Sequence, residues 1–328
     1  MVCRWGVLGP GFIATRAVIP ALQRIPQARV VAVASQHRER GRAVAQQFGI
    51  ERTYDTYQEL LNDPEIDAVY IALPNHLHCE WTLQAARAGK HVLCEKPLAT
   101  TVQECEEMIA VCQEAGVYLM EAVMYRFHPR MQHLKRILVD GKLGELRFIH
   151  CAFSFPLADG ENYRNYRRYG GGALLDVGSY CVNAVRWLAG AEPQTVQGLT
   201  RYRTQGEIDV ATSALLQFSE QVMGHIQCSF DAAEHQVIEV IGSTGAVTAP
   251  LAFTAWQDDT TILLIQQGSH VQRQVFAPAD PYQIMVAHFT ECVLGQLPLD
   301  YPPTDGLATL HLLHALRNQA VNHSRSHP

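Results

Sequence analysis

Two side chains that could exchange protons lie four residues apart, directly after a run of three glycines. The run is Gly170–Gly172, and the two side chains are the carboxyl group of Asp176 and the phenol of Tyr180. On a helix, residues four positions apart share a face. An acid and a phenol that face one cleft could bind a substrate hydroxyl and transfer its proton, and the glycines would let the backbone approach something bulky. By spacing alone, the simpler alternative of a helix-terminal carboxylate and a half-buried tyrosine is favoured.

A lysine follows a short apolar segment in the sequence Cys94-Glu95-Lys96-Pro97. The apolar segment is predicted to be the fourth strand of a parallel sheet, and ligands bind at the carboxyl ends of such strands. An amine there can hydrogen-bond a substrate oxygen and lower the pKa of a neighbouring acid–base group. A lysine in an ordinary surface turn is equally consistent with this position.

A glycine-rich motif of the form G-x-G-x-x-A lies between the first predicted strand and the first predicted helix. Gly9 would permit a tight turn, Gly11 would let the backbone approach a pyrophosphate, and the small Ala14 would allow close helix–strand packing. The N-terminus of the following helix attracts an anion. This placement favours a dinucleotide site that includes Phe12 and Ile13 over a bare structural turn.

The segment after the second predicted strand bears on the choice between NADP and NAD. An NAD site usually has an acidic residue here that holds the ribose 2′-hydroxyl. This chain has Ser35 and Gln36 instead, and its first acid, Glu39, comes inside the next helix. Arg38 and Arg40 are close by, and a guanidinium group suits a 2′-phosphate. The sequence therefore favours NADP over NAD, the alternative being a solvated basic helix face.

The histidines of the segment His76-Leu77-His78-Cys79 raise the question of a metal site. No further cluster of ligands at zinc-like spacing accompanies them. We therefore expect no bound metal, and we predict instead a loop over the cofactor that leads into the next helix.

The elements that would position these residues change character near residue 122. Before it, strand-like and helix-like segments alternate, as in a doubly wound parallel sheet. After it, strand-like stretches follow one another, which predicts a mostly antiparallel sheet. We predict an α/β Rossmann domain, residues 1–122, that binds NADP. Residues 123–328 are predicted to form an α+β domain for substrate binding and oligomerisation, an open sheet with helices on one face. The predicted strands are 4–9, 28–34, 67–73, 91–94, 117–121, 145–155, 195–204, 210–219, 222–231, 236–241 and 261–266, and the predicted helices are 13–25, 38–48, 78–89, 102–115, 129–140, 174–189, 282–295 and 304–321.

One predicted strand of the second domain alternates between apolar and other residues. Its apolar side carries Val222, Gly224, Ile226, Cys228 and Phe230. An apolar sheet face needs a partner, so we expect a homodimer or homotetramer that forms through this sheet.

Composition excludes several classes of partner. A net charge of −6 is unsuited to coating nucleic acid or an anionic membrane. No apolar run approaches the ~20 residues of a membrane helix, and the first residues lack a signal-peptide pattern. The nine cysteines are scattered without a C-x-x-C pair, which favours a reducing cytoplasm.

Taken together, these segments resemble the glucose–fructose oxidoreductase / inositol dehydrogenase / MocA family, and the resemblance spans nearly the whole chain. The stretch 120–129 resembles the branch that holds dimeric dihydrodiol dehydrogenase and NADP-dependent D-xylose dehydrogenases. The other segments that carry the resemblance are the glycine motif 9–14, the stretch 74–78, AGKHVLCEKPLA at 88–99, GGGALLDVGSY at 170–180 and the closing pair of helices.

The resemblance implies a Rossmann domain and an open sheet with the active site between them. It implies that Lys96 is catalytic and that Asp176 and Tyr180 contact the substrate. Several NADP-using relatives have arginine where this chain has Gln36, so the 2′-phosphate contact is expected at Arg40. The cofactor contacts that we expect are Gly9, Gly11, Phe12, Ile13, Ser35, Arg38, Arg40, Leu73, Pro74, Asn75, His78, Glu95 and Lys96, and the substrate contacts are Arg126, His128, Arg164, Asp176 and Tyr180.

The expected function is hydride transfer between NADP and a CH–OH or C=O group of a small polyhydroxylated substrate, such as a sugar, cyclitol or dihydrodiol. We expect Tyr180 to be the general acid–base, with Lys96 lowering its pKa and Asp176 orienting a neighbouring hydroxyl. A non-catalytic NADP-binding sensor or co-regulator on the same fold is the alternative. The presence of Lys96, Asp176 and Tyr180 together favours an enzyme.

Overall fold

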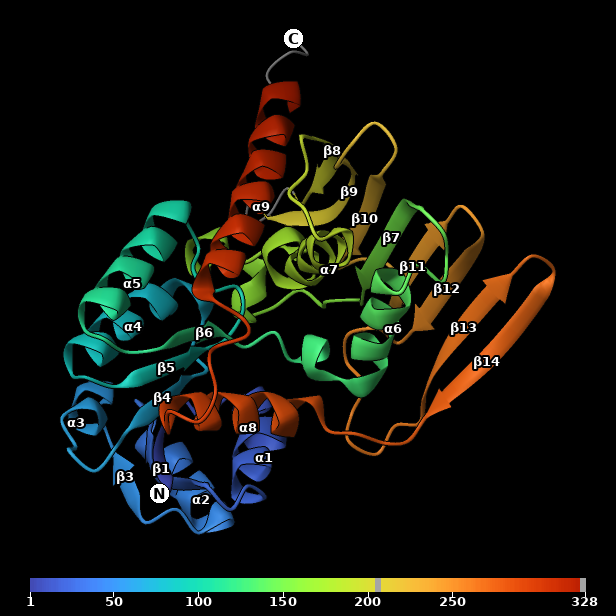
Figure 1. Cartoon of the computed structure of the whole chain (residues 1–328). Helices are drawn as coiled ribbons and strands as arrows, with labels where there is room; N and C mark the ends of the chain where they lie inside the picture. The colour runs from blue at the N-terminus through green and yellow to red at the C-terminus, as the bar shows by residue number, and fades with distance from the viewer. Residues whose placement is uncertain (204–207, 325–328) are drawn as a thin grey trace. The chain divides into compact units, whose positions relative to one another are not determined.

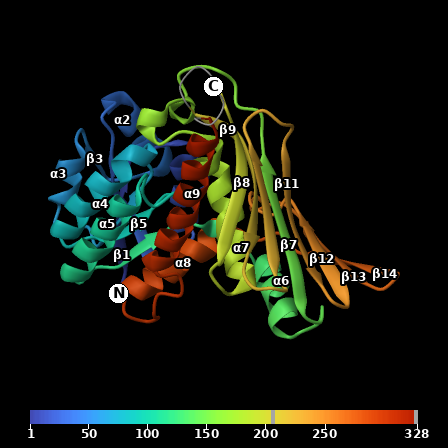
Figure 2. The same cartoon turned by 90° about the horizontal axis from the view of Figure 1, so that it is seen from above.

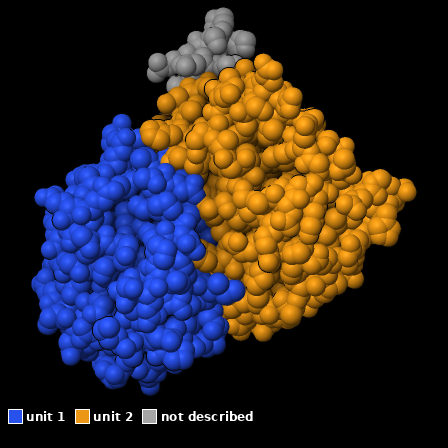
Figure 3. All heavy atoms as spheres, in the orientation of Figure 1, with its two compact units in different colours: residues 1–124, 282–307 blue, residues 125–281, 308–328 orange. Residues whose placement is uncertain are grey.

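The computed structural model describes residues 1–203 and 208–324, with side chains up to residue 319. The chain divides into two compact units (Figure 1, Figure 3). Unit 1 consists of residues 1–124 and 282–307, and unit 2 consists of residues 125–281 and those from 308 onward. The last helix, α9 (Pro303–Ser324), therefore begins in unit 1 and continues in unit 2.

Unit 1 is built on a six-stranded sheet in the order β3-β2-β1-β4-β5-β6, and all of its strand pairs are parallel. The central strand β4 is buried along its whole length, which explains its continuous apolar sequence. The predicted doubly wound parallel sheet is confirmed. The strands are β1 (Cys3–Leu8), β2 (Ala28–Ala34), β3 (Arg52–Tyr54), β4 (Ala68–Ile71), β5 (His91–Cys94) and β6 (Leu119–Glu121).

Helices connect these strands, and one further helix joins unit 1 from late in the sequence. In helix α8, Phe289 packs against the buried ring of Trp5, with ring centroids 5.6 Å apart, and Thr290 Oγ1 accepts a hydrogen bond from Trp5 Nε1. Two helices begin with a π-helical turn, at Ala14–Val18 and Leu174–Gly178, where we predicted regular helix. The helices of unit 1 are α1 (Ile19–Gln23), α2 (Arg38–Phe48), α3 (Tyr57–Leu61), α4 (His78–Arg87), α5 (Val102–Glu114) and α8 (Pro281–Val293).

Unit 2 contains an eight-stranded sheet in the order β14-β13-β12-β11-β7-β10-β9-β8. The pair β7–β10 is parallel, and the remaining pairs are antiparallel, which confirms the predicted mostly antiparallel sheet. Its helices are α6 (Pro129–Val139), α7 (Ser179–Ala189) and the larger part of α9. The strands are β7 (Leu146–Ser154), β8 (Thr195–Tyr202), β9 (Asp209–Gln217), β10 (Met223–Ser229), β11 (His235–Gly242), β12 (Gly245–Pro250), β13 (Thr261–Gln267) and β14 (His270–Phe276).

The alternation predicted around 222–230 is present, and its apolar side faces a helix of the same unit. Gly224, Ile226 and Cys228 are buried, and a Cβ atom on Gly224 would lie only 2.5 Å from Val185 Cγ1 of α7. Helix α7 of the same unit therefore covers this face (Figure 2), and these side chains need no other partner. No helix in the described part of unit 2 covers the opposite, outward face.

Residues 1–203 and 208–324 contain no helix that is both long and apolar enough to cross a membrane. They contain no group of three or more His, Cys, Asp or Glu side chains placed to hold a metal ion. All nine cysteines are buried free thiols.

Candidate functional site

The glycine-rich turn after β1 packs tightly against the loop that follows β4. Gly9 has a φ of 82°, a backbone angle that glycine adopts more readily than other residues. A Cβ atom on Gly9 would lie 2.5 Å from Leu73 Cδ2. A Cβ atom on Gly11 would lie 3.3 Å from the carbonyl oxygen of Ala72. The two loops therefore form one surface at the carboxyl edge of the sheet, and Phe12 on the turn is 68% exposed.

A hollow of about 540 Å³ lies beside this turn. Arg16, Arg40 and Thr15 are among the residues that line it. Two cations next to a glycine turn fit a phosphate-bearing dinucleotide, so the residues present suit NADP. Arg16 was not predicted, although its position five residues after Gly11, in the helix that follows the turn, could have indicated it.

The other residues predicted near the 2′-phosphate are differently placed. Arg38 forms an exposed ion pair with Asp55 at 3.2 Å and does not line the hollow. Ser35 is buried, and its hydroxyl both donates to the carbonyl of His37 and accepts from its N–H. Of these predicted contacts, the structure therefore brings only Arg40 into the hollow.

His78, which we predicted to contact the cofactor, is fully buried at the start of α4. Its Nε2 lies 2.8 Å from the carbonyl oxygen of Leu73, and its Nδ1 lies 2.8 Å from that of Pro97. The ring therefore links the loop after β4 to the loop after β5, so we revise its role from direct contact to positioning. Pro74 and Asn75 belong to the loop after β4, and Asn75 is buried.

Lys96 lies in the loop directly after β5, half-buried at the carboxyl edge of the parallel sheet. The preceding Glu95 is held in place because its Oε1 accepts a hydrogen bond of 2.5 Å from the hydroxyl of Tyr70. The Glu95 N–H in turn donates to the carbonyl of Ile71 on β4. The backbone on which Lys96 stands is thus tied to the strand beside it.

A buried carboxyl group, Glu121, lies at the end of β6. Its Oε1 accepts from the N–H of Leu98 at 2.9 Å, and its Oε2 accepts from the hydroxyl of Tyr301 at 3.2 Å. Burial raises the pKa of Glu121 to about 7, with a smaller increase from Asp305. The Leu98 N–H, the Tyr301 hydroxyl and the charge of Lys96 oppose this shift.

In unit 2, Asp176 and Arg164 form an ion pair, with Arg164 Nε 2.7 Å from Asp176 Oδ2. Burial alone would lower the pKa of the Arg164 guanidinium, but Asp176, with smaller contributions from Tyr163 and Tyr180, raises it above its usual value. The structure therefore places a cation in electrostatic contact with both the acid and the phenol that we predicted to bind substrate.

Tyr180 itself is buried, 8% exposed, in an aromatic cluster. Its ring centroid lies 5.5 Å from Phe153, 5.5 Å from Phe253 and 6.1 Å from Tyr125. Asp176 lies in the π-helical turn and Tyr180 in the first turn of α7. These rings fix the phenol by packing on more than one side.

The three glycines before Asp176 serve the fold of unit 2, in contrast to our expectation that they admit something bulky. A Cβ atom on Gly171 would lie 2.4 Å from the carbonyl oxygen of Arg164, and one on Gly172 would meet the carboxylate of Asp209. Asp209 accepts a hydrogen bond from the N–H of Leu174. The glycines therefore let the chain approach its own β9 strand and start the helix that carries the candidate residues.

Two weaker substrate candidates, His128 and Arg126, make contacts within unit 2. His128 is buried, and its Nδ1 accepts from the Arg130 N–H at the start of α6, so it caps this helix and does not lie at a cleft rim. Burial, followed by repulsion from Arg130, lowers the pKa of His128 to about 4. The guanidinium of Arg126 lies over the ring of Trp187, 5.0 Å from its centroid.

Comparison with protein-family models decides the family. Residues 3–123 match the model described as "Oxidoreductase family, NAD-binding Rossmann fold", and residues 131–248 match the "GFO/IDH/MocA C-terminal domain". The chain belongs to the GFO/IDH/MocA oxidoreductase family. The resemblance noted from the sequence is thereby confirmed.

Curated relatives and solved structures support this family over most of the chain. D-xylose 1-dehydrogenase (NADP(+)) 2 of Haloferax volcanii is 36% identical over 296 residues, 90% of each chain. Trans-1,2-dihydrobenzene-1,2-diol dehydrogenase of Mus musculus is 36% identical over 75% of this chain and 74% of its own. A 3-ketoreductase of Actinomadura kijaniata, solved in complex with NADP and TDP-benzene, has a TM-score of 0.91 at 32% identity, covering 97% of this chain and 98% of its own.

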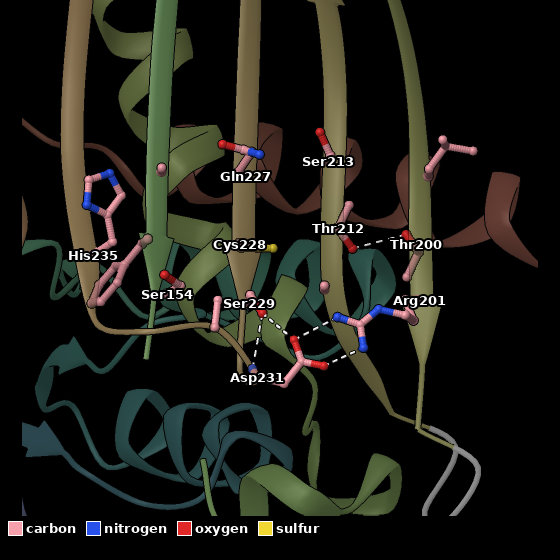
Figure 4. Close-up of a pocket in the computed structure, with 15 residues that line it drawn as sticks. Ser154, Thr200, Arg201, Thr212, Ser213, Gln227, Cys228, Ser229, Asp231 and His235 are labelled. Atoms are coloured by element: carbon pink, nitrogen blue, oxygen red, sulfur yellow. Dashed lines mark hydrogen bonds and ion pairs between the residues drawn. The ribbon is translucent and has the colours of Figure 1, made fainter. Parts of the chain in front are cut away.

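This GFO/IDH/MocA chain has a second hollow, of about 510 Å³, on the outward face of the unit 2 sheet (Figure 4). Arg201 on β8 and Asp231 after β10 form a two-contact ion pair at its edge, and Ser229 Oγ donates to the same carboxylate. Asp176 and Tyr180 do not line it. The hollow is therefore separate from the candidate catalytic residues of unit 2.

Proposed function

We propose that this chain transfers a hydride between NADP and a CH–OH or C=O carbon of a small polyhydroxylated substrate. The observation that carries the proposal is the position of Lys96, in the loop after β5 at the carboxyl edge of the parallel sheet that also carries the glycine turn. Ligands of open parallel sheets bind at this edge. The named relatives act on a pentose and on a dihydrodiol, which supports this substrate class.

The cofactor, when bound, supplies the redox chemistry as a hydride donor or acceptor. The pyrophosphate is proposed to bind at the turn of Gly9 and Gly11, and the 2′-phosphate at the Arg16 and Arg40 guanidinium groups. The NADP dependence of the xylose dehydrogenase and the NADP complex of the ketoreductase support this choice of cofactor.

The residues of this chain would position the substrate and transfer the proton. Tyr180 is proposed to exchange the proton of the reacting oxygen, and Lys96 to hydrogen-bond that oxygen. Asp176, held by Arg164, would accept a hydrogen bond from a neighbouring substrate hydroxyl.

A turnover assay tests the proposal and separates it from the alternative of a non-catalytic NADP-binding sensor. The purified chain is mixed with NADP or NADPH and a panel of aldoses, cyclitols, keto sugars and trans-dihydrodiols, while nicotinamide absorbance is followed. We expect substrate-dependent turnover with at least one class. Tight NADPH binding without turnover on any class would favour the sensor.

Arg40→Ala should weaken NADPH binding much more than NADH binding. A charged hydrogen bond is worth about 1.5–3 kcal/mol, so NADPH affinity should fall roughly ten- to hundredfold. Both cofactors are titrated by nicotinamide fluorescence. Arg38→Ala is the matched control, because Arg38 pairs with Asp55 outside the hollow. Equal affinity of the wild type for both cofactors would contradict the prediction.

We also propose that the chain forms a homodimer or a dimer of dimers through the outward face of the unit 2 sheet. Large apolar side chains are exposed there on neighbouring strands: Phe148, Leu199, Leu215 and Met223 are 51%, 75%, 49% and 36% exposed. Burying them would remove apolar surface from water. Light scattering at micromolar concentration should give at least a dimer mass, and Leu215→Glu should reduce it. A monomeric wild type would count against the proposal.

The location proposed for the chain is the cytoplasm. Each of the nine cysteines is a free thiol, as is usual in a reducing compartment.

A further inference from the structure

The peptide group between Pro97 and Leu98, directly after Lys96, is held at both of its polar ends. The carbonyl oxygen of Pro97 lies 2.8 Å from His78 Nδ1, and the N–H of Leu98 donates to Glu121 Oε1 at 2.9 Å. His78 is fully buried and Glu121 is 3% exposed. Both contacts are therefore shielded from water. A buried hydrogen bond is stronger than one in water, and its loss costs more.

Each of the two side chains is itself fixed from elsewhere in unit 1. The other nitrogen of His78 lies 2.8 Å from the carbonyl oxygen of Leu73, and a neutral imidazole, which has one N–H, donates to one of the two carbonyls. The other oxygen of Glu121 accepts from the hydroxyl of Tyr301. Gly306 of α9 approaches so closely that a Cβ atom there would lie 2.8 Å from Glu121 Oε2. The carboxyl group is thus enclosed, and it cannot turn away from Leu98 without repacking.

A buried carboxyl group with a raised pKa is costly to the fold when ionised, and a neutral apolar side chain would avoid this cost. Burial lowers the pKa of His78 and raises that of Glu121, and the charge of Lys96 acts on both members of the pair as a smaller contribution toward a lower pKa. If Glu121 helps to place Lys96, this role would explain why a carboxyl group is present at this buried position.

We propose that Glu121 is a positioning residue for Lys96, which it serves by holding the Pro97–Leu98 peptide together with His78. The inference rests on the proposed function, because it assigns Glu121 a role only through the catalytic amine. This role depends on a side chain long enough to place an acceptor oxygen at the Leu98 N–H. It does not depend on the negative charge of the carboxylate. Protonation of Oε2 leaves Oε1 free to accept from Leu98, so the carboxyl group serves in either ionisation state.

Two variants separate the effect of side-chain length from the effect of charge. In Glu121→Gln, the side-chain carbonyl can accept from Leu98 and the amide can donate to the oxygen of Tyr301, so kcat should stay within a few-fold of the wild type. In Glu121→Asp the charge is kept, but the chain is one methylene shorter. A misplacement of about 1 Å can cost ~10²-fold in rate, so kcat should fall by roughly ten- to a hundredfold with little change in the Kd of NADPH. The opposite order, with Gln impaired and Asp active, would overturn the proposal.

A double-mutant cycle shows whether the effect passes through Lys96. We expect the Asp substitution to reduce kcat in the wild type and to have no further effect in the Lys96→Met background. Losses that multiply would contradict a positioning role. Asp63→Asn is the matched control, because Asp63 is a buried carboxylate that also accepts from a backbone N–H and a tyrosine hydroxyl, before β4 and away from Lys96. It should lower thermal stability without lowering kcat.

The same cycle separates failure of this inference from failure of the proposed function. Near-normal turnover by Lys96→Met alone would contradict the assigned role of the lysine and with it the proposed chemistry. A large loss in Lys96→Met together with full activity in Glu121→Asp would overturn only the role of Glu121.

Discussion

Replacing Lys96 by Met should lower kcat by about 10²–10⁴-fold, the usual scale for losing acid–base assistance, while NADPH affinity stays close to that of the wild type. Methionine keeps most of the side-chain volume but removes the charge and the donors. The backbone of this loop is held by Glu95, His78 and Glu121, so the substitution should leave the loop in place. The measurement is kcat on the best substrate, with NADPH titrated by fluorescence.

Lys142→Met is a suitable control for the Lys96 variant. Lys142 is exposed on the surface of unit 2, where its partner is Asp140 at 3.5 Å. It should change neither kcat nor cofactor binding, since isolated surface ion pairs contribute little. A Lys96→Met enzyme with near-normal kcat would show that the amine has no part in the chemistry.

Tyr180→Phe should lower kcat strongly and remove one ionisation from the pH–rate profile. A free phenol has a pKa of about 10, too high for an efficient base at neutral pH. The Arg164 guanidinium interacts with Tyr180, and a nearby cation favours the phenolate. Alcohol oxidation by the wild type should therefore rise with pH through a single ionisation that Tyr180→Phe removes. Carbonyl reduction should fall over the same range, because it needs the protonated phenol.

The test is kcat/KM against pH in both directions for the wild type and Tyr180→Phe. Tyr125→Phe serves as control, because it removes the hydroxyl that donates to Asn183 Oδ1 in the same aromatic cluster. This control should lose some stability but keep the ionisation. If the ionisation persists in Tyr180→Phe, another group carries the proton, and Lys96 acting directly becomes the better assignment.

The architecture could be predicted from the sequence because its signals are local. The continuous apolar run of β2 and the alternation of β10 each reflect burial within a single element. Some other strands were not predicted. Strand β14 is largely exposed and polar, β12 is short and bounded by Gly245 and Pro250, and the three residues of β3 are only partly buried.

Roles that depend on contacts between distant residues could not be predicted in this way. Nothing near Gly172 in the sequence indicates the carboxylate of Asp209 that lies against it. Histidine is a residue type that is common in active sites, but His128 caps α6. The same applies to Glu121, whose partners Leu98 and Tyr301 come from two other parts of unit 1. Such assignments need coordinates because spacing along the chain carries no information about them.

The late return of helix α8 to unit 1 has a consequence for the chain as it leaves the ribosome. All six strands of the parallel sheet have been made by residue 121, but Trp5 is covered by Phe289, and Glu121 is bonded by Tyr301. Until residues 282–307 emerge, that apolar surface stays without its native cover, the kind of surface that chaperones bind. The first unit to begin translation is therefore incomplete until residue 307 has been made, and a nascent chain stalled before α8 should be more sensitive to protease than the released protein.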